Sequence, residues 1–203
     1  MIKLKNASFV KSAPSINETV ANDVSEVAFI GRSNVGKSSL INALTNHKGL
    51  AKSSSTPGKT RLINFFDVVF AQNEKDFNAR FIDLPGFGYA KVSKSTKEEW
   101  QKNLTEFIHK RSSIRTFVHL IDSRHPSLEI DKEVHEYLQQ ICRADQQIIV
   151  FFTKADKLNQ KEVSALKKVH SHALMVSSAN KKGIQLALET IFNSLFGVKR
   201  DTL

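Results

Sequence analysis

The stretch Gly31-Arg32-Ser33-Asn34-Val35-Gly36-Lys37-Ser38 follows the phosphate-binding pattern G-x-x-x-x-G-K-[ST]. Its glycines let the backbone curl so that successive N–H groups point at phosphate oxygens. The ammonium group of Lys37 can reach the β- and γ-phosphates of a nucleotide, and the hydroxyl group of Ser38 can bind Mg²⁺. The stretch therefore predicts a nucleotide-binding loop in which each of these residues belongs to the cofactor site.

The sequence on both sides of this loop supports the same interpretation. Val27-Ala28-Phe29-Ile30 is a short apolar run typical of a buried strand, and residues 38–44 have helical spacing. A helix that begins there would direct the positive end of its dipole at the phosphates. The alternative, a glycine turn that matches the pattern by chance, does not account for the strand, loop and helix together.

The second half of the chain indicates which base is bound. The apolar run 147–152 ends in Thr153-Lys154-Ala155-Asp156, which resembles the [NT]-K-x-D element of GTPases. The Asp156 carboxylate would accept from N1–H and the exocyclic N2–H₂ of guanine. Adenine lacks this donor pair and would leave a buried carboxylate unpaired. The stem of Lys154 would lie over the base, and in these GTPases a backbone N–H from a segment such as Val176-Ser177-Ser178 donates to guanine O6.

Two further segments are expected to contact Mg²⁺ and the γ-phosphate. A strand-like run ends in Asp83-Leu84-Pro85-Gly86, a D-x-x-G element in which Asp83 would hold Mg²⁺ through a water and Gly86 N–H would contact the γ-phosphate. The first switch is expected between the helix after the phosphate loop and the next strand, with cofactor contacts from Gly58-Lys59-Thr60-Arg61-Leu62. Thr60 is its best metal ligand, although Thr56 and the neighbouring serines are alternatives.

These interpretations give a definite set of roles. We expect Ser38, Thr60 and Asp83 to surround the metal ion, Asp83 through a water. We expect Lys37, Thr60 and Gly86 to act directly in phosphoryl transfer. The cofactors implied are GTP or GDP and Mg²⁺.

The complete motif set resembles the EngB-type (YihA/YsxC) bacterial GTPases, in the TrmE/Era-like, translation-factor-related group. The matching elements are G-R-S-N-V-G-K-S-S, S-x-T-P-G-K-T, D-L-P-G-F-G-Y-A and T-K-A-D. Asp122-Ser123-Arg124-His125-Pro126, after the apolar run 117–121, is a further match, and the resemblance covers about residues 5–197. It implies a compact GTP-binding fold, a nucleotide-dependent role in large ribosomal subunit assembly, and a link to cell division and septation.

One position suggests slow catalysis. Phe87 follows D-x-x-G, where Ras-like GTPases carry a glutamine that orients the attacking water, and a phenyl ring cannot do this. Arg32 and Arg61 lie near enough in sequence to be considered as arginine fingers, but neither is in an obvious position. Related Era-like GTPases carry an asparagine such as Asn34 that helps to coordinate K⁺ beside the phosphates. The other interpretation is that Asn34 satisfies backbone groups of its own loop.

Strands that alternate with helices predict an α/β fold, a three-layer P-loop GTPase of the Ras-like type. We expect a mostly parallel sheet with helices on both faces and one antiparallel edge strand from the hairpin 62–82. Residues 1–22 are expected to be an N-terminal extension that adds a short strand at 7–10. Residues 23–198 would form a single G domain, and residues 199–203 a tail.

Composition limits the cellular setting. The chain has 203 residues, 40% of them hydrophobic, and a single cysteine, Cys142, so it cannot form an intramolecular disulfide. The first residues lack the apolar region of a signal peptide, and no segment approaches the roughly 20 apolar residues of a membrane helix. We expect a cytoplasmic monomer that does not insert into a membrane.

The formal net charge of +10 indicates a polyanionic partner. A single lysine is usually only solvated surface, but many basic residues gather around the two expected switches. They are Lys48, Lys52, Lys59, Arg61, Lys91, Lys94, Lys97, Lys102, Lys110, Arg111 and Arg115. Together they suggest an RNA-binding face that contacts mainly phosphates. The expected partner is the large ribosomal subunit or its precursor, through ribosomal RNA and proteins.

Two other functions account for parts of the sequence. A P-loop kinase would need a lid and an acceptor site, for which the sequence contains no obvious insertion, and it leaves Asp156 unexplained. A constitutive RNA-binding protein with a vestigial nucleotide site is disfavoured because Lys37, Ser38, Asp83 and Asp156 are all present.

Overall fold

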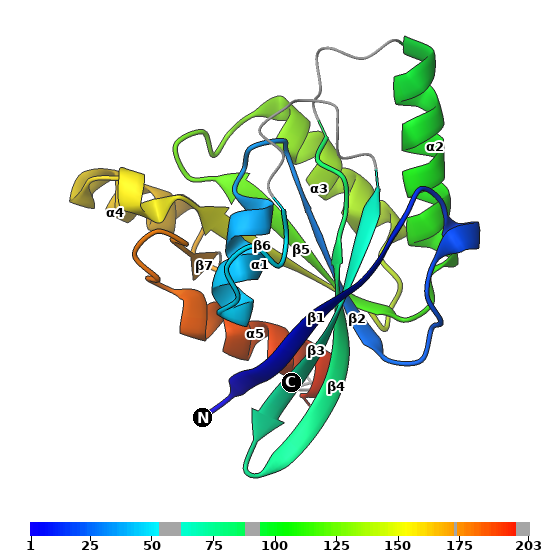
Figure 1. The fold of residues 1–203 in the computed structure, drawn as a ribbon. Helices are drawn as coiled ribbons and strands as arrows, with labels where there is room; N and C mark the ends of the chain where they lie inside the picture. The colour runs from blue at the N-terminus through cyan, green and yellow to red at the C-terminus, as the bar shows by residue number, and fades with distance from the viewer. Residues whose placement is uncertain (53–61, 88–93, 173, 198–203) are drawn as a thin grey trace.

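The computed structural model of the protein describes residues 1–52, 62–87, 94–172 and 174–197. Strands and α-helices alternate along these residues from residue 75 onwards (Figure 1). In chain order they are β1 (Lys3–Ala13), β2 (Ser25–Gly31), α1 (Lys37–Thr45), β3 (Ile63–Gln72), β4 (Lys75–Asp83), α2 (Lys94–Lys110), β5 (Ile114–Asp122), α3 (Glu129–Ile141), β6 (Gln147–Thr153), α4 (Gln160–Val169), β7 (Leu174–Met175) and α5 (Ile184–Phe196). None of the helices in the described part of the chain is long and apolar enough to cross a bilayer.

The seven strands form one sheet in the order β1-β3-β4-β2-β5-β6-β7. β3 runs antiparallel to both of its neighbours, whereas the pairs among β4, β2, β5, β6 and β7 are parallel. Because parallel strands end at the same edge of a sheet, the loops that follow them converge there. The predicted α/β fold with a mostly parallel sheet and an antiparallel strand from the hairpin is confirmed, but that strand, β3, is not at the edge, because β1 pairs with its other side.

The first strand is longer than the sequence predicted. Instead of a short strand at 7–10, β1 covers Lys3–Ala13, pairs with the outer side of β3 and takes the edge of the sheet. Register shifts between Leu4 and Asn6 and between Phe9 and Lys11 interrupt its two-residue alternation. Most of its side chains are exposed, so no buried apolar face marked the strand in the sequence.

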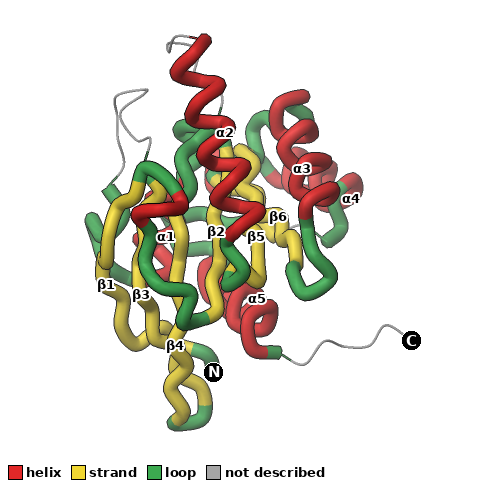
Figure 2. Tube along the Cα trace, turned by 90° about the vertical axis from the view of Figure 1, so that its right-hand side faces the viewer, coloured by secondary structure: helices red, strands yellow, loops and turns green. Residues whose placement is uncertain are grey.

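Successive residues of β2 face opposite sides of the sheet, and each side is covered by helices (Figure 2). Val27 and Phe29 join the core shared with α1 and α5, whereas Ala28 and Ile30 join the core shared with α2 and α3. This explains why the strand before the phosphate loop is apolar throughout rather than alternating.

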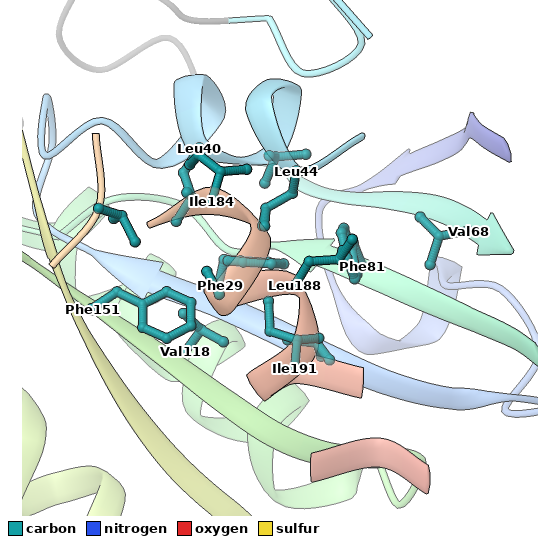
Figure 3. Packing of buried hydrophobic residues seen from close by; sticks show 14 of the residues in the cluster. Phe29, Leu40, Leu44, Val68, Phe81, Val118, Phe151, Ile184, Leu188 and Ile191 are labelled. Carbon is teal, nitrogen blue, oxygen red and sulfur yellow. The ribbon is translucent and has the colours of Figure 1, made fainter. Parts of the chain in front are cut away.

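The core beneath α1 and α5 fixes the position of the phosphate loop. Figure 3 shows one face of each helix packing on the central strands. The labelled residues there include Leu40 and Leu44 of α1, Ile184, Leu188 and Ile191 of α5, and Phe29, Phe81, Val118 and Phe151 of the sheet. Burying each such side chain contributes about 1.5–3 kcal/mol, so α1 is held firmly at the end of the loop.

A buried ionic cluster lies near the amino end of β2, away from the convergent loops. Glu26 accepts hydrogen bonds from Arg111 (2.8 and 2.6 Å), Ser113 (2.6 Å) and Arg80 (3.3 Å). Arg111 also donates to the chain segment 19–21. Glu26 is 0% and Arg111 1% exposed. The prediction that Arg111 belongs to a basic surface is therefore wrong, because Glu26 and these carbonyl groups hold its guanidinium inside the protein.

Candidate nucleotide-binding site

The predicted phosphate-binding loop connects β2 to α1 at the carboxyl edge of the parallel strands (Figure 1). Asn34 and Gly36 have φ angles of 62° and 103°, a left-handed conformation that asparagine and glycine adopt more easily than other residues. α1 begins at Lys37, directly after Gly36. The positive end of its dipole and its first free N–H groups are thus available to a phosphate.

The D-x-x-G element packs directly on this loop. The Ser33 N–H donates to the Phe87 carbonyl at 3.1 Å, and the Phe87 N–H donates to the Gly31 carbonyl at 3.3 Å. A side chain at Gly86 would place its Cβ 3.0 Å from the backbone nitrogen of Ser33. Glycine at this position therefore permits the close approach that brings the predicted γ-phosphate contact beside the phosphate loop.

Lys37 and Asp83 meet between the two elements. Lys37 begins α1 and Asp83 ends β4, and their side chains form an ion pair that is largely buried. Ser38 follows in the first turn of α1. A hydroxyl and a carboxylate are hard oxygen ligands of the kind that Mg²⁺ binds together with substrate phosphates. Ser38 and Asp83 therefore fit the predicted metal, with Asp83 also close enough to orient Lys37.

The predicted first switch lies mostly beyond the described residues. Gly58, Lys59, Thr60 and Arg61 fall in the segment that the structure leaves undescribed. Leu62, the last predicted residue of this group, immediately precedes β3 and is exposed. The metal-ligand role of Thr60 stays a prediction.

The two predicted base-binding elements come together at the ends of β6 and β7. The Ser177 hydroxyl donates to the Asp156 carboxylate at 2.6 Å, and the Ala155 N–H donates to the Val176 carbonyl at 3.1 Å. The hydrogen bond from Ser177 is the largest reason why the pKa of Asp156 lies below its ordinary value. The carboxylate is therefore ionised at neutral pH, the state that accepts two N–H groups.

The T-K-A-D loop is tied to the phosphate loop. The Thr153 hydroxyl donates to the Val35 carbonyl at 2.6 Å, and the Lys154 ammonium donates to the Asn34 carbonyl at 2.6 Å. Lys154 has a φ of 55° and also donates to Asp122 at 2.9 Å. Asp122 opens the motif Asp122-Ser123-Arg124-His125-Pro126, for which the sequence alone predicted no role. The sequence did contain one signal for a role in the site: Asp122 comes directly after an apolar run, and such a residue ends a parallel strand.

Arg32 is oriented by a residue that sequence analysis missed. Its Nε donates to the Asp131 carboxylate on α3 at 3.1 Å, and the Asp131 side chain is only 2% exposed. Burial raises the pKa of Asp131 above its ordinary value, against the opposing effect of Arg32. The pair links the phosphate loop to α3 instead of leaving Arg32 free as an arginine finger. No local pattern could have found it, because the two residues are 99 positions apart.

Phe87, the residue directly after D-x-x-G, is buried. Only 8% of the residue is exposed, and it belongs to the core beneath α2 and α3. Its ring lies 6.3 Å from that of His119, whose pKa is lowered to about 3 by burial and, secondarily, by the neighbouring His135. His119 is therefore neutral, and this side of the D-x-x-G element is apolar packing.

Known proteins match the chain along most of its length. The family described as "50S ribosome-binding GTPase" matches residues 26–154. A "probable GTP-binding protein EngB" of Campylobacter jejuni strain RM1221 is 53% identical over 195 residues, 96% of this chain and 98% of the relative. The protein of the same description in Aliarcobacter butzleri strain RM4018 is 55% identical over 195 residues, 95% of this chain and 98% of the relative.

Solved structures have the same fold as this chain. A crystal structure of a probable GTP-binding protein EngB covers 84% of this chain and 98% of its own, with a TM-score of 0.62 and 25% identity. The cytosolic domain of the T. maritima FeoB iron transporter, in its GMPPNP form, has a TM-score of 0.56 at 21% identity and supports the fold alone. Because the family match, the nearly full-length relatives and the arrangement of the loops agree, the chain belongs to the EngB family of GTP-binding GTPases.

Proposed function

We propose that this GTPase is a nucleotide-dependent switch in the assembly of the large ribosomal subunit, on which normal cell division and septation depend. It would act as a cytoplasmic monomer through a G domain spanning residues 23–198. One observation carries the proposal: Phe87, directly after D-x-x-G, is hydrogen-bonded at both its N–H and its carbonyl to the phosphate loop. Phe87 lies shortly before α2 in the chain, and Lys102 of α2 is exposed, so we infer that the state of the phosphates is relayed to the predicted basic face. The family description, ribosome-binding, supports the same partner.

Each site residue has its own expected role in GTP binding and hydrolysis. Lys37 would neutralise charge on the β- and γ-phosphates, and Gly86 N–H would contact the γ-phosphate. Ser38, Thr60 and, through a water, Asp83 would hold Mg²⁺, which supplies positive charge against the transferred phosphoryl group. Asp156 would accept from the guanine edge. Loss of the γ-phosphate would release Gly86 and change the segment that follows it.

Intrinsic hydrolysis is expected to be slow. Phe87 occupies the position of the water-orienting glutamine, is largely buried and has no hydrogen-bonding side chain. Arg32 is engaged by Asp131. The nucleotide state would then persist until a ribosomal partner or a cation completes the site.

A potassium dependence would identify that cation. We expect wild-type GTP turnover to be roughly tenfold faster in KCl than in NaCl at equal ionic strength, because K⁺ beside Asn34 would offset developing charge. Asn34 has a φ of 62°, so Asn34→Gly removes the side chain without the strain that alanine would meet there. This variant should turn over GTP equally slowly in both salts. Equal wild-type rates in KCl and NaCl would leave Asn34 only its role in the loop.

Ribosome association can be tested with matched charge reversals. Lys48, Lys52 and Lys102 are exposed members of the predicted basic face. Reversing all three to glutamate should weaken cosedimentation with large-subunit precursors by roughly tenfold or more and flatten its salt dependence. Hydrolysis by the free protein should be retained. Binding is measured with a non-hydrolysable GTP analogue and with GDP.

The control carries the same charge change elsewhere. Lys161, Lys167 and Lys168 are exposed on α4, and their reversal should leave cosedimentation within about twofold of wild type. Equal binding in both nucleotide states would favour a constitutive RNA-binding protein over a switch. Indifference to salt and to the first triple variant would show that the basic residues serve solubility alone.

A further inference from the structure

Asp122 is a buried carboxylate at the carboxyl end of β5, between the phosphate loop and the T-K-A-D loop. Only 3% of the residue is exposed. It accepts hydrogen bonds from the Lys154 ammonium at 2.9 Å and from the Arg124 guanidinium at 2.9 and 2.7 Å. The Arg124 backbone N–H adds a fourth at 3.1 Å. A carboxylate so placed holds whichever cations reach it, because leaving it unpaired would be costly.

The Lys154 ammonium is consequently fixed from two sides. It donates to Asp122 and to the Asn34 carbonyl, while the Lys154 backbone adopts the left-handed conformation. With its backbone and its ammonium both fixed, the stem between them has little freedom. The same ammonium joins the base-binding loop to the phosphate loop, and Asp122 is the anionic partner that holds it there.

The surrounding charges favour this arrangement. Burial alone would raise the pKa of Asp122, but the hydrogen bonds from Arg124 and Lys154 outweigh it and bring that pKa well below its ordinary value. Arg124 is 44% exposed, lies two residues from Asp122 and is also attracted by Asp156. Arg124 therefore compensates part of the Asp122 charge within its own turn, whereas Lys154 is reached across 32 positions.

We propose that Asp122 is a positioning residue for guanine nucleotide binding, which orients Lys154 over the base and couples the T-K-A-D loop to the phosphate loop. This rests on the proposed role of Lys154 at the base. In this role Asp122 acts through Lys154 and not by contact with the nucleotide. Its contribution is to keep the lysine stem in place when the nucleotide binds, so that its loss should appear mainly as faster nucleotide release.

The test is a double-mutant cycle on release of fluorescent mant-GDP, followed by stopped-flow. Asp122→Asn should release the nucleotide about tenfold faster than wild type, as expected for loss of a charge-assisted hydrogen bond. Lys154→Met keeps an apolar stem but removes the ammonium. In that background, Asp122→Asn should change the rate by less than about twofold, because the group that it orients is gone. Additive effects would overturn the inference.

Two controls separate positioning from a general loss of structure. Arg124→Gln removes the other cation from Asp122 but leaves Lys154 in place, so release should stay within about twofold of wild type. IDP lacks the exocyclic amino group that Asp156 would bind. The preference for GDP over IDP should therefore be unchanged in Asp122→Asn, whereas a displaced loop would reduce it. An equally fast release from Arg124→Gln, or a lost preference, would make Asp122 merely structural.

Two further outcomes keep the result interpretable. Should Asp122→Asn fail to fold, Asp122→Glu, which keeps the charge but moves it by one methylene, goes through the same cycle. If wild type binds ADP as well as GDP, the guanine site itself is wrong. If wild type prefers GDP but the cycle shows no coupling, only the role of Asp122 is wrong.

Discussion

Asp156→Asn should lower the affinity for GTP by roughly 10⁴-fold and favour xanthine nucleotides instead. In the wild type, the Asp156 carboxylate, held by Ser177 at 2.6 Å, would accept two N–H groups from guanine. The amide of asparagine offers one acceptor and one donor, which suits the carbonyl oxygen that xanthine carries in place of the guanine amino group. A site built around hydrogen bonds rejects the wrong partner by about this factor, because buried polar groups are left unpaired.

The measurement is competition of GTP, XTP and ATP against fluorescent GDP, for wild type and variant. Asp145→Asn is the matched control, since Asp145 is a half-exposed aspartate engaged by arginines outside the site. It should bind GTP like the wild type. The guanine assignment would be wrong if ATP competes as well as GTP for the wild type, or if Asp156→Asn keeps its GTP affinity.

Glu26→Ala should lower the free energy of unfolding by about 3–5 kcal/mol, the usual cost of removing one partner from a buried ion pair. The substitution would leave the guanidinium of Arg111 buried without its carboxylate partner. It would also remove one of the carboxylates that pair with Arg80. Because small domains are stable by only about 5–15 kcal/mol, this is a large fraction of the total. Arg111 directly follows α2, so the end of that helix should loosen as well.

Urea unfolding followed by circular dichroism gives this free energy. Glu133→Ala, on the exposed side of α3, is the control and should change stability by less than about 0.5 kcal/mol. Glu26→Gln keeps the size and the acceptor oxygen but not the charge, and should fall between the two. A loss below about 1 kcal/mol for Glu26→Ala would mean that the arginines find other partners or water.

The nucleotide elements could be predicted because each is a short contiguous motif at the end of a strand. The P-loop, D-x-x-G, T-K-A-D and V-S-S segments each follow an apolar run. Parallel strands end at one edge of the sheet, so recognising the strands was enough to place the four segments together. Asn34 and Gly36 adopt the left-handed backbone conformation, and asparagine and glycine are residue types that adopt it easily. The sequence of the loop itself thus already suits its backbone.

Other features depended on the order of strands, which no local pattern specifies. β5 lies beside both β2 and β6, so Asp122 reaches Lys154 across 32 positions. The placement of α3 pairs Asp131 with Arg32, which is 99 positions away in the sequence. At the amino end of β2, Glu26 pairs with Arg111, which is 85 positions away. In the sequence alone, an arginine or aspartate is predicted to lie on the solvated surface. A charged side chain is buried only where an opposite charge and hydrogen bonds offset the cost of its desolvation, so its burial cannot be predicted until its partner is known. Short motifs were enough to predict what the loops bind. The charged side chains that hold those loops in place became visible only in the folded chain, because each has its partner far away in the sequence.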